Sequence, residues 1–388
     1  MKKICLLAIL PFIISSVFCQ NFDELLVSKQ IDCADISKNS SLYFIKYINE
    51  DKIDSAEILL NYWESKCGLR EPIFRAKILL ALYTREFNET LLTETPLNFI
   101  FNYQNRMNLI KYAKHYIYDN YKSYYGYIPP GEQFDIFTQQ WALELKSYYY
   151  SESIEYLLAE FYSDNYEVIF SKIQSKTFEN CFLTKKYNEV LNTYKNLYEV
   201  HISFLTGIWI PTGRLAKIGI HPELGFQMGW KKKRMNYDLT LAIKFVNAPN
   251  DYYARRGAGK DRELTNHFFG GYIGFEAGGD VFVRKKHEIQ VTGGVAWDGF
   301  DVLKEDKERE LKPASTSSFN INFGVAYRYY ITSNLYISLR AKYNVVDYSL
   351  NKVIDFTGNP VTVQFLIGYV KNSLKDANLK ALEYKLRK

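Results

Sequence analysis

The segment FNINFGVAYRYYI, residues 319–331, shows the pattern that decides the fold. Large apolar side chains occupy every second position, and small or polar residues such as Asn322 and Arg328 lie between them. Successive side chains of a β-strand point to opposite faces, so this alternation predicts a strand with one apolar face. With a less regular first strand at residues 203–210, the alternation predicts eight strands within residues 201–371. The other segments begin at Leu224, Tyr237, Phe269, Ile289, Leu335 and Val361.

The glycines divide the chain into two halves. Three of the 21 glycines lie before residue 201 and 18 lie after it. Glycine is disfavoured inside helices and tolerated in strands and turns. We therefore expect an α+β multidomain protein, with an all-α domain at residues 20–200, a β domain at 201–371 and a basic tail at 372–388. A composition of 47% apolar and 24% charged residues excludes a disordered chain and a polytopic helical membrane protein.

The two faces of the strands indicate which side of the sheet meets lipid. The second face carries glycine, serine, threonine, asparagine and glutamine with few charges, whereas a soluble barrel needs a lysine- and glutamate-rich exterior. The apolar face also carries aromatic residues near strand ends, where an interfacial girdle lies. These are Trp230, Tyr237, Trp297, Tyr329, Tyr343 and Tyr369. The pattern favours an antiparallel transmembrane β-barrel over a secreted, lipocalin-like one.

The connections between strands alternate in length. We expect short links at residues 231–236, 284–287 and 332–334, and long ones at residues 246–267, 300–318 and 349–360. Outer-membrane barrels have short periplasmic turns and longer external loops. An even strand number returns the chain to its starting side, so the helical domain and the tail are expected in the periplasm.

These residues resemble a known family. The segment GIWIPTG at residues 207–213, followed by Gly219 and a glycine-alternating strand, is similar to the opening of many small eight-stranded outer-membrane β-barrels of the OmpA type. The resemblance covers under half of the chain. It departs from the commonest pattern in the long helical domain and in the basic tail, which leaves residues 365–369 as the expected assembly signal.

The N-terminus predicts export. Lys2 and Lys3 precede an apolar run at residues 4–17, which is shorter than the roughly 20 residues of a membrane span. We expect residues 1–19 to be a cleaved signal peptide, the alternatives being a membrane anchor or a lipid on Cys19. Among the cysteines that remain, Cys33 and Cys67 form the expected disulfide.

Residues 20–200 carry amphipathic helical patterns. Residues 54–66 and 71–83 predict an αα-hairpin, with Gly68 as the stop between them. Successive helix pairs of this size are weakly similar to tetratricopeptide-like arrays, and a plain helical bundle is the alternative. Either would offer a protein-binding surface, so we expect an envelope protein as the partner of this domain.

Charged residues occupy some inward positions of the predicted barrel. An eight-stranded barrel is about wide enough for side chains alone, so we expect charges of both signs to pair as a plug. The alternative is a gated, narrow ion path. The predicted interior charges are Asp238, Lys244, Glu276, Asp280, Asp298, Arg328, Arg340 and Lys342.

Basic clusters lie in the connections. Arg255, Arg256, Lys260 and Arg262 are expected to contact lipopolysaccharide phosphates from an external loop. The basic turns at residues 231–234 and 284–286 would face anionic inner-leaflet lipid or merely flank the strands. Nucleic acid is not an expected partner in this compartment.

The sequence offers little for catalysis. His267 with Asp261, Asp298 and Asp301 is the one nearby constellation, and no nucleophile motif accompanies it. No metal-ligand spacing occurs, so neither a metal nor another cofactor is expected. We therefore expect a non-enzymatic outer-membrane barrel that anchors a periplasmic protein-binding domain. The alternatives are a narrow channel and an adhesin acting through the external loops.

Overall fold

The computed structural model describes residues 32–386. The chain divides into two compact units, with the boundary between Lys186 and Tyr187, and the first strand of the sheet begins at Glu199. The predicted signal peptide lies outside the described residues.

The first unit is helical. Its α2 and α3 pack side by side, and α3 is capped at its C-terminal end by Gly68, whose positive φ of 69° suits glycine. The predicted hairpin corresponds to α3 and α4. Helix length falls from 17 residues in α2 to 5 in α6 and α9, which favours a plain bundle over a regular repeat. The helices are α2 (Cys33–Asn49), α3 (Ile53–Cys67), α4 (Glu71–Thr84), α5 (Pro96–Lys111), α6 (Tyr116–Asn120), α7 (Gln133–Lys146), α8 (Ile154–Tyr162) and α9 (Ile169–Ile173), with 3-10 helices η1 (Glu89–Leu92) and η2 (Lys176–Phe178).

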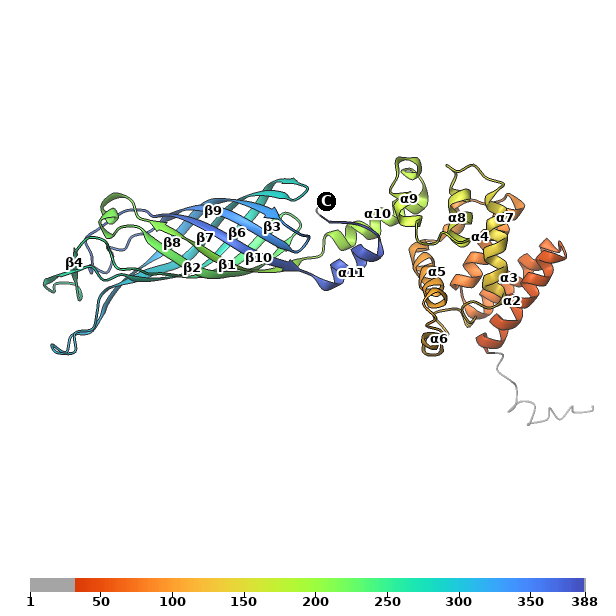
Figure 1. Cartoon of the computed structure of the whole chain (residues 1–388), viewed down its shortest axis with the longest axis horizontal. Helices are drawn as coiled ribbons and strands as arrows, with labels where there is room; N and C mark the ends of the chain where they lie inside the picture. Colours follow the sequence, from red (N-terminus) through yellow and green to blue (C-terminus); the bar gives the residue numbers. More distant parts are fainter. Residues whose placement is uncertain (1–31, 387–388) are drawn as a thin grey trace, which may run out of the picture. The chain divides into compact units, whose positions relative to one another are not determined.

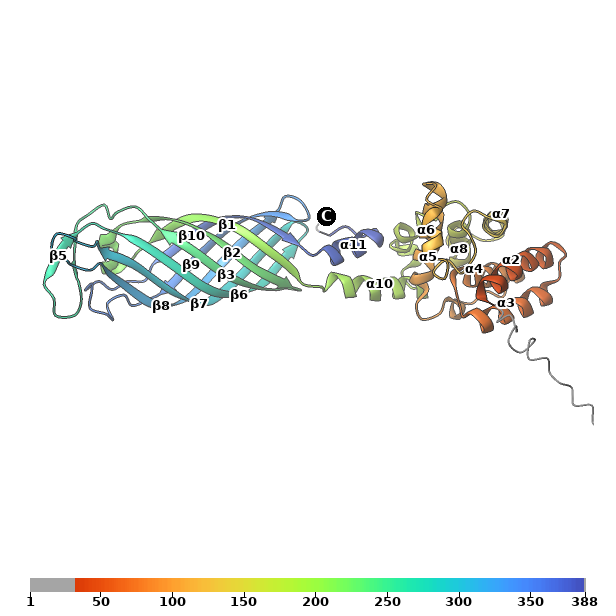
Figure 2. The same ribbon diagram turned by 90° about the horizontal axis from the view of Figure 1, so that it is seen from below.

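The second unit is a closed barrel of antiparallel strands in the order β1-β10-β9-β8-β7-β6-β3-β2 (Figures 1 and 2). Strands β1 and β10 close it, with Phe204 opposite Ile367. The prediction of an eight-stranded antiparallel barrel after a helical domain is confirmed. The strands are β1 (Glu199–Ile210), β2 (His221–Lys232), β3 (Met235–Lys244), β6 (Phe269–Arg284), β7 (His287–Leu303), β8 (Ala314–Tyr330), β9 (Leu335–Val345) and β10 (Val361–Lys371).

The two ends of the barrel differ. At the turn end, connections of two to four residues join neighbouring strands at 233–234, 285–286 and 331–334. At the loop end, the connections are residues 211–220, 245–268, 304–313 and 346–360. The first holds the 3-10 helix η3 (Gly213–Ile218), and the second holds a separate hairpin of β4 (Tyr252–Arg255) and β5 (Arg262–Thr265).

The long strands β7 and β8 correct one predicted boundary. The connection predicted at residues 300–318 is confined to 304–313, because both strands continue past the region of regular alternation. In that extension Phe300 and Val302 point inward and are buried. Apolar side chains therefore lie on the inner face here, whereas they lie on the outer face of the regular strands, and the alternation used to find the strands no longer applies.

The tail after β10 forms α11 (Ser373–Ala381) at the turn end. The Lys375 ammonium group lies 3.4 Å from the Glu199 carboxylate at the start of β1. The hydroxyl of Tyr187, in α10 (Phe182–Lys195), donates a 2.9 Å hydrogen bond to the Leu382 carbonyl. The predicted basic tail is thus a folded part of the barrel unit. No helix within residues 32–386 combines the length and apolarity needed to cross a membrane.

Candidate functional site

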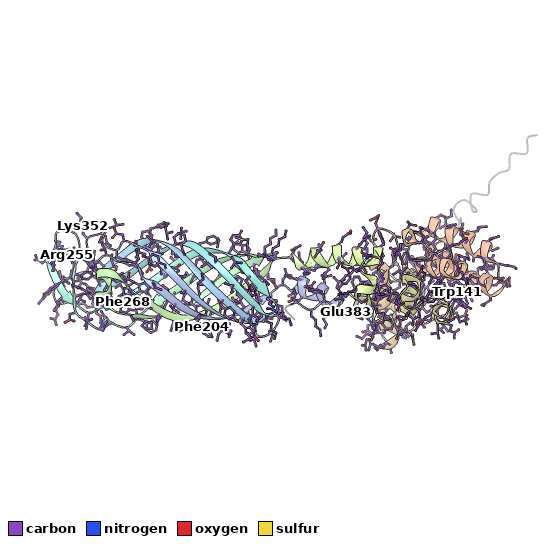
Figure 3. All side chains as sticks on the ribbon, turned by 90° about the horizontal axis from the view of Figure 1, so that it is seen from above. Trp141, Phe204, Arg255, Phe268, Lys352 and Glu383 are labelled. Atoms are coloured by element: carbon purple, nitrogen blue, oxygen red, sulfur yellow. A yellow bond between two sulfur atoms is a disulfide. The ribbon has the colours of Figure 1, made fainter. Side chains whose placement is uncertain are left out.

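The barrel wall has an apolar outer face and a polar inner face. Outward side chains such as Phe204, which Figure 3 labels on the wall, are exposed over the middle of the strands. Trp230 of β2 stacks on Tyr237 of β3 near the turn end, with ring centroids 5.4 Å apart. Trp297 and Tyr343 are exposed towards the loop end. Apolar bands bounded by aromatic residues are typical of barrels that span a bilayer.

A charge cluster fills the middle of the interior. Arg340 lies 2.6 Å from Glu276 and 3.4 Å from Asp238, and Lys342 lies 2.7 Å from Glu276. The Nε2 atom of His201 is 2.5 Å from Asp238. These groups are buried, so each charge depends on its partners for compensation.

A second cluster lies nearer the turn end. The Lys231 ammonium group is 2.6 Å from both Asp280 and Glu288, and Arg328 lies 3.7 Å from Glu288 and over the ring of Tyr336. The placement of Lys231 in a lipid-facing basic turn was wrong. Lys231 is only 5% exposed, because it follows the outward Trp230 and therefore points into the barrel.

A third ion pair joins Lys244 and Asp298 near the loop end. The Lys244 ammonium group also lies over the ring of Trp209, and Asn320 donates a 3.3 Å hydrogen bond to Asp298. The structure thus places all eight predicted charges inside the barrel. Sequence reasoning missed other inward polar residues, because they lie at strand ends or beside proline, where the alternation is short. The missed residues are His201, His221, Glu223, Lys231 and Glu288.

The loop end is closed by a packed apolar cap. His221 stacks on Phe268 with ring centroids 3.5 Å apart, and Phe268 in turn contacts Trp209 and Phe300. Figure 3 labels Phe268 towards this end of the barrel. The cap consists of Trp209, Leu215, Ile218, Ala248, Tyr252, Ala254, Phe268, Phe300, Val302, Leu303, Ala314, Tyr348, Val353 and Ile354.

Apolar and aromatic side chains fill further layers of the interior. Leu205, Tyr272 and Leu366 belong to a buried cluster in the middle of the barrel. Tyr330 and Tyr336 pack together near the turn end. With the ion pairs between these layers and the cap above them, the arrangement is that of a filled barrel.

The arginines predicted to contact phosphate are bound to carboxylates. Arg255 and Arg262 lie 2.6 Å and 2.9 Å from Asp355, which joins the β4–β5 hairpin to the connection at 346–360. Figure 3 shows Arg255 at the loop end, and Lys352 of the second connection lies there too. Hydrogen bonding to Arg255 holds the pKa of Asp355 below its ordinary value.

The other two cations of that hairpin differ from each other. Arg256 lies 2.8 Å from Glu263 and donates a 3.0 Å hydrogen bond to the Lys304 carbonyl. Lys260 is exposed and makes no ion pair among the described residues. A lipopolysaccharide phosphate would therefore have to compete with carboxylates at three of the four cations, and the predicted contact stays a prediction.

We predict that Asp355→Asn will loosen the β4–β5 hairpin. Both arginines lose their anion, and exposed ion pairs of this kind contribute roughly 0.2–1 kcal/mol each, so trypsin should cut at Arg255 or Arg262 about two- to fivefold faster. Because the folded-state pKa of Asp355 is lowered, the protection should be present at neutral pH and lost only as pH falls through that pKa. Asp251→Asn, at an exposed carboxylate of the same loop, is the control; equal cleavage rates in the two variants would contradict the prediction.

The predicted catalytic constellation is not assembled. Asp298 is bound to Lys244, and Asp301 accepts a 2.6 Å hydrogen bond from Ser315. Among residues 32–386, no hydrogen bond or ion pair joins His267 to Asp261, Asp298 or Asp301. In the same part of the chain, no group of three or more histidine, cysteine, aspartate or glutamate residues could hold a metal ion.

The helical unit contains its own buried ion cluster. Asp135 of α7 lies 2.8 Å from both Arg75 and Arg106, and Arg75 lies 2.9 Å from Glu71. Burial alone would raise the pKa of Asp135, but the two arginines outweigh burial and hold that pKa below its ordinary value. The cluster joins α4, α5 and α7, and its role is structural.

In the helical unit, Cys33 and Cys67 form a disulfide that ties the start of α2 to the end of α3. The same unit has two surface features that a partner could contact. A groove of about 520 Å³ lies between α2 and the start of α7, lined by residues that include Leu42, Pro129 and Ile136. A tyrosine-rich segment around α6 also exposes Tyr112, Tyr116, Tyr121 and Tyr124.

The fold and the filled interior define the class of the protein: a small, closed, eight-stranded barrel of the outer-membrane type that follows a helical unit. No protein-family model matches the sequence, and no curated protein matches it.

Solved structures do match. The chain is similar to the N-terminal β-barrel domain of OprF from Pseudomonas aeruginosa, with 12% identity over 45% of this chain and 97% of that one, at a TM-score of 0.30. It is also similar to Neisserial surface protein A, with 12% identity over 45% and 95% of the two chains, again at 0.30. Ail, the attachment invasion locus protein of Yersinia pestis, matches at 11% identity over 45% and 97%, also at 0.30. The strand register, and not this likeness, defines the barrel of this chain.

Proposed function

We propose that this protein is a non-enzymatic outer-membrane barrel that anchors a helical, protein-binding unit in the periplasm. One observation carries the first part of the proposal: over the middle of the strands the exposed side chains are apolar and the ionised side chains are buried inside, while exposed charges such as Lys232 and Arg284 lie at strand ends. A water-soluble barrel has the opposite arrangement, and a closed barrel leaves no unpaired strand edge in lipid. The short turns at the end that carries the helical unit favour the periplasmic side for that unit.

We expect this barrel not to conduct ions. The ion pairs and the apolar cap occupy the space that a permeant ion would need, and separating buried charges is costly. Planar-bilayer recordings of the full chain should show no reproducible conductance steps. Steps whose size changes in Arg328→Gln or Glu276→Gln would contradict this expectation and support a narrow channel.

The groove between α2 and α7 supports the protein-binding part of the proposal. Leu42 and Ile136 are about half exposed on its walls, and exposed apolar grooves bounded by polar residues are typical of protein interfaces. A photoreactive amino acid at position 136 of the full chain should cross-link to one envelope protein in cells. The same substitution at Ile58, an exposed apolar residue of α3, is the control. Identical products from both positions, or none from position 136, would contradict the assignment of this groove.

One observation favours a second function, external binding through the loops. Tyr253 and Leu264 lie opposite each other on the β4–β5 hairpin and are 56% and 58% exposed, although the ion pairs with Asp355 hold the hairpin in place. Rigid, exposed apolar pairs are suited to binding. Cells that carry Tyr253→Ser with Leu264→Ser should then adhere less to a host surface than cells with the wild-type chain, while Leu350→Ser, in another exposed loop, should change adhesion little. Equal adhesion of all three strains would exclude this second function.

A further inference from the structure

We propose that a concave site at the turn end, around the β2–β3 turn, binds the headgroup of an anionic phospholipid. The inference rests on the proposed membrane location of the barrel. A hollow of about 780 Å³ lies against this turn. Its lining combines an aromatic wall with a basic rim, and consists of Asn196, Trp230, Lys232, Lys233, Arg234, Met235 and Tyr237.

The basic rim of this hollow has no protein anion. Lys232, Lys233 and Arg234 are all exposed, and within the described residues none of them makes an ion pair. They differ in this from Lys231, which is paired inside the barrel, and from Arg255, which is paired with Asp355. Three adjacent cations without counter-charges attract an anion, and a phosphodiester accepts hydrogen bonds from both lysine and arginine.

The aromatic wall places that anion at a lipid surface. Trp230 and Tyr237 are directly opposite each other on β2 and β3, and Trp230 is 47% exposed on the outer face. Lys232 and Met235 form the pair two residues further on, about 7 Å along the strands. Aromatic rings lie at the headgroup level of a bilayer. A cation one step beyond them therefore meets the phosphate of a lipid whose acyl chains pack on the rings.

The hairpin between β6 and β7 provides a matched comparison. Both turns have a two-residue loop that begins with a lysine of positive φ, Lys233 at 56° and Lys285 at 52°. In the second turn, however, Lys286 donates a 3.2 Å hydrogen bond to the Ile331 carbonyl. Each turn carries three cations, Lys232, Lys233 and Arg234 in the first and Arg284, Lys285 and Lys286 in the second. Because Lys286 is already bonded to a carbonyl and the hollow lies against the first turn, we assign the lipid site only to the first.

The test uses the fluorescence of Trp230 in the full chain, reconstituted in phosphatidylethanolamine vesicles. Trp297→Phe removes the exposed tryptophan at the other end, and Trp63, Trp141 and Trp209 are buried. Phosphatidylglycerol brominated on its acyl chains near the glycerol should quench this fluorescence at a concentration about three- to tenfold lower than brominated phosphatidylcholine does. Added inorganic phosphate should not relieve the quenching.

The variants decide whether the site is specific. Lys232→Gln with Lys233→Gln and Arg234→Gln should abolish the preference for phosphatidylglycerol, whereas Arg284→Gln with Lys285→Gln and Lys286→Gln should retain it. Equal quenching by both lipids in the Trp297→Phe protein, or equal loss of preference in both triple variants, would overturn the inference. Failure of the chain to insert into vesicles would instead contradict the proposed membrane location, because insertion is measured separately by the migration of unboiled protein on a gel.

Discussion

Replacing Glu276 by alanine is expected to lower the free energy of unfolding of the barrel by about 3–5 kcal/mol. The carboxylate accepts contacts from Arg340 at 2.6 Å and from Lys342 at 2.7 Å, and all three side chains are at most 1% exposed. Without Glu276, Arg340 retains the longer contact to Asp238 and a 3.1 Å hydrogen bond to the uncharged Gln227, and Lys342 loses its ion pair. A buried charge without compensation costs far more than the lost interaction itself contributed.

This effect can be measured by urea unfolding of the barrel in detergent micelles. The fraction of folded chain is read at each urea concentration from the migration of unboiled samples. Glu305→Ala, in the exposed connection at the loop end, removes the same side chain where it has no buried partner, and should change stability by no more than about 0.5 kcal/mol. Similar midpoints for Glu276→Ala and Glu305→Ala would show that the interior charges do not hold the barrel together.

Asp135→Asn is expected to destabilise the helical unit by a comparable amount, about 3–5 kcal/mol. Arg75 and Arg106 each lose a carboxylate 2.8 Å away, and both arginines are fully buried. Glu71 remains beside Arg75, but Arg106 is left with the carbonyls of Tyr125 and Pro129. Loss of the ellipticity of the helices with heat in the full chain measures the change.

The pH dependence of this difference follows from the lowered pKa of Asp135. A carboxyl group with a lowered folded-state pKa contributes stability above its unfolded pKa, and that contribution is lost as pH falls through the folded pKa. The stability difference between wild type and Asp135→Asn should therefore be constant near neutrality and shrink in acid. Glu144→Gln, on the exposed side of the same helix, should show little difference at any pH. A difference for Asp135→Asn that grows in acid would contradict the assigned ion cluster.

The strands of the barrel could be predicted from the sequence because their signal is local. Alternation over ten or more residues, as in the segment at 319–331, is set by the pleat and needs no knowledge of the partner strand. The boundaries failed where that signal changes: Glu199 and His201 extend β1 with inward polar residues, and Phe300 and Val302 extend β7 with inward apolar ones.

The candidate site was predictable only in part, because pairing depends on register across many strands. Arg340 and Glu276 are 64 residues apart, and their contact follows from the closure of the whole barrel. The period of two assigned both residues to the interior but could not say which charges meet. Lys231 was missed because a run of four basic residues is typical of an exposed turn, although the first of them still follows the pleat.

The ion clusters of the helical unit left no trace in the sequence pattern. Arg75 and Asp135 are separated by 60 residues and lie in different helices, α4 and α7. Arginine and aspartate are mostly exposed in proteins, so residue type alone gives no reason to place either side chain in the interior. Only the packing of α4, α5 and α7 brings the charges together.

The central claim is that residues 199–371 form a barrel folded within the outer membrane. Gel migration of the full chain, extracted from the outer-membrane fraction in mild detergent and loaded with or without boiling, tests it most directly. We predict that the chain is recovered in that fraction and that the unboiled sample migrates differently from the boiled one, because the closed strands resist the detergent of the gel until they are heated. Recovery of the chain as a soluble protein, with the same migration before and after boiling, would contradict the account.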